Sequence, residues 1–338
     1  MIELITLTRP SKGGFSGGKN LDLPNRSHRI SSAIVSIIVF VFLLFCLDKY
    51  LVEQPSIYKR KQQLCFGKSK QATVLILGSS HALFGIRPDY LSEQAINLSN
   101  VSQSLDLDQK LLAKALKQNH KCKLVIIPVS YFSLEESLTS TAEEWRDCLY
   151  SRYLGVSERS LWQICFDPRY WSLPFLYRSY LLPWQKLRDD YTLASYRVDD
   201  FGWAANKNLL DGRKAEAIGL ARVKLFESFM KPQTLQYHEK ILQRIIDFCR
   251  QRRVKVLLVT MPCWGTFRKF AAGDKITQTQ TFMSALVFPN QIAYADYWDD
   301  SRFALSDFAD TDHLNSTGAA KFSHLLDCEF VKPFLNSQ

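Results

Sequence analysis

The sequence predicts an α/β fold in which helices cover both faces of a parallel sheet. Short, continuous apolar runs of the kind found in buried parallel strands recur along the chain. Segments with the spacing of amphipathic helices separate them, and such alternation is typical of a parallel sheet. The chain has 338 residues, of which 46% are hydrophobic, so it can build a large core and is not a disordered protein.

The expected elements begin at about residue 72. Residues 73–77 form an apolar run that ends at Gly78, as a buried parallel strand would. The other expected elements, in chain order, are a weaker strand over 95–98, a leucine- and alanine-spaced helix over 105–118, a strand over 123–128, a long amphipathic helix over about 234–252, strands over 254–260 and 291–295, and a last helix from about Ser316. Sheets of this kind place their functional sites at the carboxyl ends of the strands.

Residues 30–47 are predicted to form a transmembrane anchor. This run carries no charged residue and approaches the roughly 20 residues that a helix needs to cross a bilayer. A buried core helix would show a polar face, and a signal peptide would have a shorter apolar region and a cleavage site with small residues. An uncleaved single-pass anchor is therefore favoured. Residues 1–29 are polar and predicted to be a flexible tail, and a basic connector follows the anchor to about Gln71.

The charges beside the anchor do not fix its orientation. Arg26 and Arg29 precede it, while Lys49 and the basic residues 59–61 follow it. The difference in positive charge between the two ends is too small for the positive-inside rule to decide the orientation, and long domains can cross a membrane regardless of charge. We expect the large domain to lie outside the cytoplasm, mainly because of the function argued below.

Composition narrows the classes of partner and cofactor. The net charge of +10 and isoelectric point of about 9.1 permit nucleic acid, anionic lipid or acidic glycan. The basic residues are scattered and no Cys/His finger spacing occurs, so nucleic-acid binding is not expected. None of the eight cysteines forms a CxxC pair, and no glycine-rich phosphate loop is present. We therefore expect no cofactor and mostly buried cysteines, with one or two disulfides left open.

The connection between the third and fourth strands, about residues 133–232, is predicted to be a mostly helical insertion, because it is too long for a loop. It is rich in aromatic residues. These are Trp145, Trp162, Trp171, Trp184 and Trp203, with Tyr150, Tyr153, Tyr170, Tyr177, Tyr180, Tyr191 and Tyr196. A small helical subdomain with an aromatic core is the favoured interpretation. A lid or platform for sugar rings and a surface facing the bilayer are the alternatives, since amphipathic aromatic side chains suit both.

A candidate nucleophile follows the first strand. The sequence Gly78-Ser79-Ser80-His81 lies where a strand ends and residues 82–86 can continue as a short helix. A serine at such a position exposes its hydroxyl at the carboxyl edge of the sheet, and the amides at the helix start face developing negative charge. A serine that only caps the helix is the common alternative.

The sequence DTDH at residues 310–313, just before the last helix, supplies a candidate base. His313 would take the proton from Ser80, and Asp310 would fix the imidazole tautomer and stabilise the imidazolium. A capping aspartate beside a loop histidine is the alternative. Among the other histidines only His81, next to the candidate nucleophile, is a serious rival base.

These two motifs resemble those of the SGNH (GDSL-like) hydrolase superfamily. In that family the nucleophilic serine follows the first strand in a Gly-Asp-Ser block, and the last block is Asp-x-x-His. The matching residues are Gly78, Ser79 and Ser80 for the first block, with Ser79 in place of the aspartate, and Asp310 and His313 for the last. The resemblance covers about residues 72–132 and 254–328. It implies a three-layer α/β/α, flavodoxin-like domain over residues 72–328 that contains the insertion.

The resemblance also implies oxyanion and substrate-binding residues. The second block has a counterpart in residues 97–104, where Ser102 would offer its backbone amide to the oxyanion beside that of Ser80. Ser99 and Ser102 stand where the family often has glycines. The third block usually supplies an asparagine, which is not visible here, so another residue after the third strand replaces it or this donor is missing. The residues predicted for these roles are Ser102, Asn100, Gln103, Ser130 and Tyr131.

The function that the resemblance implies is a membrane-anchored serine esterase or O-acyltransferase, with acetyl as the expected acyl group. Its substrate would be a bacterial cell-envelope or exported polysaccharide. Ser80, His313 and Asp310 would form the triad, and an acyl-serine would pass its acyl group to water or to a sugar hydroxyl. The expected partners are an acylated sugar or polysaccharide and a membrane acyl donor or assembly protein. The expected location is the bacterial inner membrane, with the large domain in the periplasm.

The alternative is an accessory protein that binds polysaccharide or an assembly partner and has a weak or inactive site. The missing asparagine and the serines in place of glycines favour this alternative. A metal enzyme is the least favoured reading, because the oxygen-rich segment 307–313 has no second histidine cluster beside it.

Overall fold

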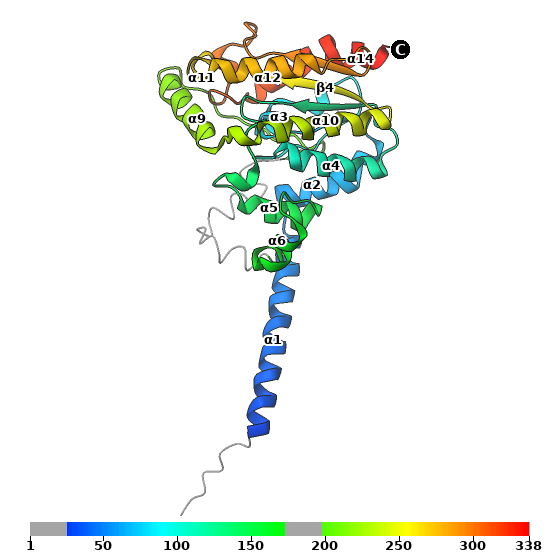
Figure 1. Cartoon of the computed structure of the whole chain (residues 1–338), viewed down its shortest axis with the longest axis vertical. Helices are drawn as coiled ribbons and strands as arrows, with labels where there is room; N and C mark the ends of the chain where they lie inside the picture. Colours follow the sequence, from blue (N-terminus) through cyan, green and yellow to red (C-terminus); the bar gives the residue numbers. More distant parts are fainter. Residues whose placement is uncertain (1–25, 173–197, 338) are drawn as a thin grey trace, which may run out of the picture. The chain divides into compact units, whose positions relative to one another are not determined.

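The computed structural model of the chain describes residues 26–172 and 198–337 (Figure 1). The chain divides into two units, Met1–Cys46 and Leu47–Gln338. The first unit contains most of helix α1 (Arg26–Glu53). Within the described ranges, α1 is long and apolar enough over Ser31–Glu53 to cross a membrane, a property that anchors share with signal sequences. The flexible tail predicted before residue 26 lies outside the described residues.

The second unit is built on a parallel sheet that has five strands within the described residues, in the order β2-β1-β3-β4-β5. The strands are β1 (Val74–Ile76), β2 (Ala95–Asn97), β3 (Leu124–Pro128), β4 (Lys255–Thr260) and β5 (Ile292–Asp296). Ile76 in β1 lies between Asn97 in β2 and Ile126 in β3. The direction of strand addition reverses between β1 and β3, and in such sheets ligands bind outside the carboxyl ends of the strands at this switch point.

Helices cover both faces of the sheet (Figure 1). One face packs against α2 (Ile57–Phe66), α4 (Leu105–Gln118), α10 (Leu235–Gln251) and α12 (Gly273–Ala285), and the other against α3 (Ser80–Gly85) and α13 (Ser316–Leu326). Alternate strand residues serve the two faces: Leu75 and Val125 lie in the first apolar cluster, Ile76 and Ile126 in the second. Because both of their faces are buried, β1 and β3 are apolar along their whole length, which explains the continuous apolar runs in the sequence. The prediction of a parallel sheet between two helical layers is confirmed.

Two further helices, α9 (Ala215–Phe229) and α11 (Gly265–Phe270), pack closely at the carboxyl edge of the sheet. Gly219 allows this approach, since a Cβ atom there would lie only 2.8 Å from the carbonyl oxygen of Thr266. Their apolar cluster includes Phe132 from the segment after β3. This packing brings α9 beside the candidate site.

The described part of the predicted insertion is largely helical. It contains η3 (Leu138–Ser140), α5 (Trp145–Leu149), the π-helix η4 (Tyr150–Leu154), α6 (Leu161–Phe166) and η5 (Pro168–Tyr170), and α9 closes it. Trp145, Tyr150, Tyr153 and Tyr170 belong to the same apolar core as one face of the sheet. These aromatic residues are buried as predicted, and their core is continuous with that of the sheet. Trp184, Tyr177, Tyr180, Tyr191 and Tyr196 lie outside the described residues.

The connector after the anchor is also more ordered than its composition suggests. It forms α2 and the 3-10 helix η1 (Lys68–Gln71). Lys61 is 1% exposed and donates hydrogen bonds to the carbonyl oxygens of Asn97 and Gly202, at 2.9 and 2.7 Å. Burial lowers the pKa of Lys61 to about 7. A basic residue of the connector is thus part of the core beside β2.

Candidate active site

Ser80 is the first residue of α3 and lies at the carboxyl end of β1. Gly78 adopts a φ of 107°, a conformation that glycine reaches without steric cost. Ser79 is extended and precedes the helix, but its side chain makes no capping hydrogen bond. This turn leaves Ser80 partly exposed, whereas the rest of α3 is buried. Ser80 is therefore not explained by a capping role.

Ser80, His313 and Asp310 form a continuous hydrogen-bond chain. His313 Nε2 lies 2.8 Å from Ser80 Oγ, and His313 Nδ1 lies 2.9 Å from Asp310 Oδ2. Asp310 Oδ1 also accepts the backbone N–H groups of Asp312 and His313, at 3.0 and 2.8 Å. The carboxylate thereby orients the ring so that Nδ1 donates to it and Nε2 faces the serine hydroxyl. This is the relation of nucleophile, base and orienting group that acyl transfer by serine requires.

The surroundings of His313 favour its protonated form. Burial alone would lower its pKa, but the negative charges of Asp310 and Asp312 and the Asp310 hydrogen bond outweigh burial, so the pKa of His313 is raised. An imidazolium formed by proton transfer from Ser80 is stabilised by the same two carboxylates. The site therefore provides electrostatic support for the charge that develops in the first step of acyl transfer.

A second Ser–His–Asp chain lies beside the first. Ser130 Oγ is 2.8 Å from His81 Nδ1, and His81 Nε2 is 3.1 Å from Asp312 Oδ2. Arg222 of α9 donates from Nε and a terminal nitrogen to the two oxygens of Asp312, both at 2.7 Å. The rings of His81 and His313 meet edge to face with their centroids 4.9 Å apart. The two chains are thus in direct contact.

The charges of this second chain are fixed by burial and by Arg222. Burial alone would raise the pKa of Asp312, but the charges of His313 and Arg222 and the hydrogen bonds from His81 and Arg222 hold it well below its ordinary value. Burial lowers the pKa of His81, and His313 and Arg222 add to that effect against the Asp312 hydrogen bond. His81 is therefore a neutral, buried histidine and a poorer candidate base than His313.

Arg222 and Asp312 were not predicted as site residues. Arg222 lies in a helix without a recognisable motif, and only the packing of α9 brings it to the site. Asp312 had a visible clue, since it adjoins His313 in sequence, but a carboxylate one residue away from a histidine is too common to indicate a role. Its partners come from residues 81 and 222, far away along the chain.

The predicted oxyanion loop follows β2 and is joined to the turn before Ser80. The backbone N–H of Asn100 donates to the Gly78 carbonyl oxygen at 3.2 Å. Asn100 is 1% exposed, and its Nδ2 has no hydrogen-bond partner among the described residues. Ser102 has a φ of 54°, in the left-handed region that favours glycine, and its hydroxyl donates to Glu143. The loop thus contains a buried amide donor that no other described residue pairs with.

The other predicted residues have different partners. Gln103 Nε2 donates to Asp108 at 2.6 Å, and its carbonyl oxygen accepts from Tyr150 at 3.0 Å. Tyr131 donates to Glu227 at 3.1 Å, and burial raises its pKa to about 12. Ser130 is bonded to His81, as described above. Gln103, Ser130 and Tyr131 are therefore not members of the hydrogen-bond chain that contains Ser80.

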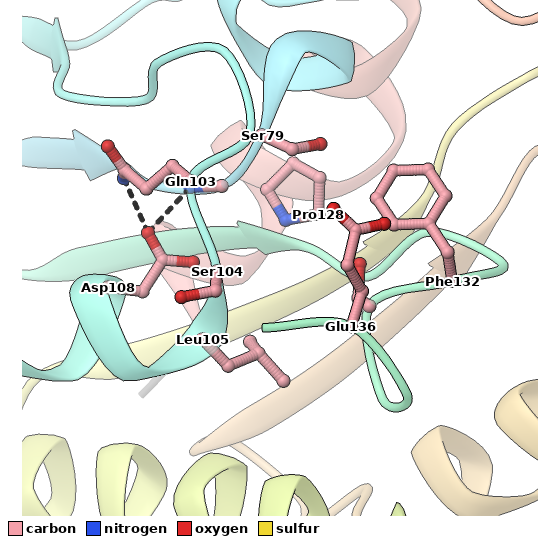
Figure 2. Close-up of a pocket in the computed structure, with 10 residues that line it drawn as sticks. Ser79, Gln103, Ser104, Leu105, Asp108, Pro128, Phe132 and Glu136 are labelled. Carbon is pink, nitrogen blue, oxygen red and sulfur yellow. Dashed lines mark hydrogen bonds between the residues drawn. The ribbon is translucent and has the colours of Figure 1, made fainter. Parts of the chain in front are cut away.

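A small polar cavity of about 10 Å³, with room for about one water molecule, lies beside the turn at Gly78 and Ser79 (Figure 2). Ser79, Gln103, Asp108 and Glu136 are among the side chains that line it. Asp108 accepts hydrogen bonds from Gln103 and from the Gly78 backbone, yet burial raises its pKa to about 7. Burial, together with the charges of Glu143 and Glu158, raises the pKa of Glu136 to about 8, and its Oε2 has no partner among the described residues. At neutral pH a protonated Glu136 can donate a hydrogen bond into this cavity.

His81, Asp312 and His313 also have the residue types of a metal site. One ligand atom from each lies within 4.8 Å of the others. The Asp312 carboxylate, however, is already bound by the Arg222 guanidinium through two hydrogen bonds. A permanent cation at this distance opposes the binding of a metal ion. The donor set therefore fits a hydrogen-bond network better than a metal centre.

Comparison with known proteins does not identify a family for this chain. No protein-family model matches the chain, and no curated protein sequence matches it. One solved structure, described as "a putative platelet activating factor from Streptococcus pneumonia", aligns with 89% of this chain and 99% of its own. Its TM-score is 0.39 and its sequence identity is 10%. The function proposed below therefore rests on the site itself and on the motif resemblance.

Proposed function

We propose that this chain is a membrane-anchored serine esterase or O-acyltransferase of the SGNH type, acting on acyl esters of a bacterial envelope or exported polysaccharide. The observation that carries the proposal is the hydrogen-bond chain from Ser80 through His313 to Asp310. The reaction class follows from this chain, and the carbohydrate substrate from the motif resemblance. The apolar helix α1 supports the anchor and, with the resemblance, a position in the inner membrane.

In the proposed mechanism Ser80 Oγ attacks the ester carbonyl carbon while its proton moves to His313 Nε2. The tetrahedral intermediate collapses, the C–O bond to the sugar breaks, and the sugar oxygen takes the proton from His313. Water or another sugar hydroxyl then attacks the acyl-serine, again giving its proton to His313. The bond between the acyl group and Ser80 Oγ then breaks and Oγ takes the proton back from His313, which leaves a free acid or a new ester and regenerates Ser80.

Asn100 is the proposed side-chain donor to the oxyanion, in addition to the backbone amide of Ser80. Its Nδ2, which has no partner in the described parts of the chain, is buried in a loop that is bonded directly to Gly78. Burial of an amide donor without a partner costs stability, so a role in binding substrate explains why the site retains it. Asn100 would then replace the asparagine that the third block usually supplies.

A fluorophosphonate probe tests the nucleophile. We expect a covalent adduct on Ser80, mapped by peptide mass spectrometry, and its loss in Ser80→Ala together with loss of acetyl release from an activated ester and from the native polymer. Ser79→Ala is the matched control, because the neighbouring hydroxyl makes no capping bond and is not bonded to His313. Undiminished activity in Ser80→Ala would sink the proposal. An intact fold without labelling would favour the accessory protein that only binds polysaccharide.

A further inference from the structure

The short helix α6 and Trp171, which follows it, expose several large apolar side chains to solvent. Leu161, Trp162 and Phe166 are 80%, 75% and 78% exposed, and Trp171, which follows closely, is 54% exposed. The rings of Trp162 and Phe166 stack with their centroids 6.0 Å apart. Single exposed apolar residues are ordinary, but a cluster of large ones marks a surface that another apolar phase covers. We call these four residues the α6 patch.

The patch is held in place by its own segment. Ser160 and Gln163 form a reciprocal capping box at the start of α6. Asp147, fully buried, accepts the backbone N–H of Glu158 at 2.8 Å on one side of α6 and the hydroxyl of Tyr170 at 2.7 Å on the other. Both ends of the segment are therefore fastened to the core, and the exposure of the patch is a property of a fixed element.

The segment that carries α6 also contacts residues that follow the apolar run of α1. Asp48 directly follows the predicted span and forms an ion pair with Arg152 in η4. Tyr58 of α2 contacts Tyr150 edge to face, with ring centroids 5.3 Å apart, and Tyr153 by stacking at 6.2 Å. Where α1 leaves a bilayer, these contacts keep the segment that carries α6 near the lipid headgroups.

We propose that the α6 patch inserts into the interface of the membrane that α1 crosses. Tryptophan and other amphipathic aromatic residues prefer this depth, where a ring is shielded from water and its polar atom is not. The patch would be a second attachment, which prevents the domain from turning freely about its anchor and holds the active-site edge in one orientation to the bilayer. This inference rests on the proposed span of α1 and is independent of the chemistry at Ser80.

Photo-crosslinking of the full chain tests the contact, in vesicles of phosphatidylethanolamine and phosphatidylglycerol. The photoreactive residue is introduced as Trp162→p-benzoylphenylalanine, and the matched control is Phe288→p-benzoylphenylalanine. Phe288 is also an exposed aromatic residue, at 58%, but it adjoins β5, at the opposite edge of the sheet from β2. We expect a phospholipid adduct at position 162 and none at position 288.

Other outcomes overturn the proposal in distinguishable ways. An adduct between position 162 and a second protein chain would identify the patch as a protein interface. Extraction of the same vesicles with alkaline carbonate reports on α1: a chain that is released shows that the span itself is wrong, while a retained chain without a lipid adduct refutes only the α6 contact.

A charged variant separates insertion from mere proximity. Leu161→Glu combined with Phe166→Glu alters two exposed side chains, so the thermal unfolding of the domain should be unchanged. We expect the lipid adduct at position 162 to be lost in this background, because carboxylates resist entry into the interface. An adduct of undiminished yield would show that the patch only lies near the lipid and would overturn the proposed insertion.

Discussion

Two Ser–His–Asp chains meet at one edge of the sheet, and their surroundings separate them. Ser80 is partly exposed and the Asp310 side chain is 31% exposed. In the neighbouring chain Ser130, His81 and Asp312 are 3%, 4% and 2% exposed, and Arg222 binds the carboxylate. The pKa of His313 is raised while that of His81 is lowered. Identical residue types thus form one chain that a substrate can reach and another that is sealed, so environment and not residue identity distinguishes the base.

The largest expected difference between the chains lies in their histidines. His313→Ala should lower turnover on an activated ester by about 10⁴-fold or more, because a triad loses nearly all its benefit with its base. His81→Asn should keep turnover within about tenfold of wild type but destabilise the fold by about 1–3 kcal/mol, since Ser130 and Asp312 lose a buried partner. Steady-state kinetics and denaturant unfolding measure both effects. A folded His81→Asn protein as inactive as His313→Ala would make His81 the base instead.

This difference also marks what the sequence could predict. The accessible hydrogen-bond chain, which contains Ser80, comes from two short motifs, one at the end of β1 and one before α13. In each motif the reactive residues lie close together in the sequence. The strands were predictable for a similar reason, because a strand buried on both faces is a continuous apolar run. The predicted helices at 105–118 and 234–252 match α4 and α10 closely for the corresponding reason of periodicity.

The sealed chain could not be predicted, because it is assembled by tertiary packing. Ser130, Asp312 and Arg222 come from three separate segments, and none of them shows a pattern by itself. The same reason applies to α2. Its lysines suggest a solvated connector, but Lys61 lies beside two carbonyl oxygens, and one of them belongs to the distant loop at Gly202. Periodicity reports which face of an element is apolar, but not which polar group another element will bring to it.

A smaller effect tests whether the accessible chain has its own oxyanion donor. Asn100→Ala should lower kcat by about 10²-fold with little change in KM, because the lost hydrogen bond forms mainly in the transition state. Gln103→Ala is the matched control in the same loop, since both polar atoms of Gln103 already have protein partners. We expect the Gln103 variant to lose stability more than turnover. Equal losses of kcat in the two variants would mean that Asn100 only supports the loop.

The smallest expected effect is a shift in the pH profile, because Asp312 of the buried hydrogen-bond chain acts on His313 of the accessible one. The acid limb of the pH profile of kcat/KM reports the base of the free enzyme, here His313, which must be neutral to accept a proton. In the wild type this limb should lie above the ordinary histidine pKa of 6.5, because Asp310 and Asp312 raise the pKa of His313. Asp312→Asn removes one of these charges and leaves Arg222 uncompensated, and both changes lower the pKa of His313. The acid limb should therefore move to lower pH, whereas Ser130→Ala, which removes no charge, should leave it in place.

The free energy of unfolding should also respond to Asp312→Asn, and the loss should be larger at neutral pH than in acid. The folded pKa of Asp312 is depressed, so its ion pair contributes stability above the unfolded carboxyl pKa, near 3.8, and this contribution is lost as the pH falls through the folded value. Asp312→Asn should thus cost about 3 kcal/mol at neutral pH, as expected when one partner of a buried pair is removed, and progressively less in acid. Unfolding measured at pH 7 and again at a pH well below 3.8 tests this dependence, because the ion pair still contributes almost fully at pH 4. A shifted acid limb without a pH-dependent loss of stability would mean that Asp312 tunes His313 without holding Arg222.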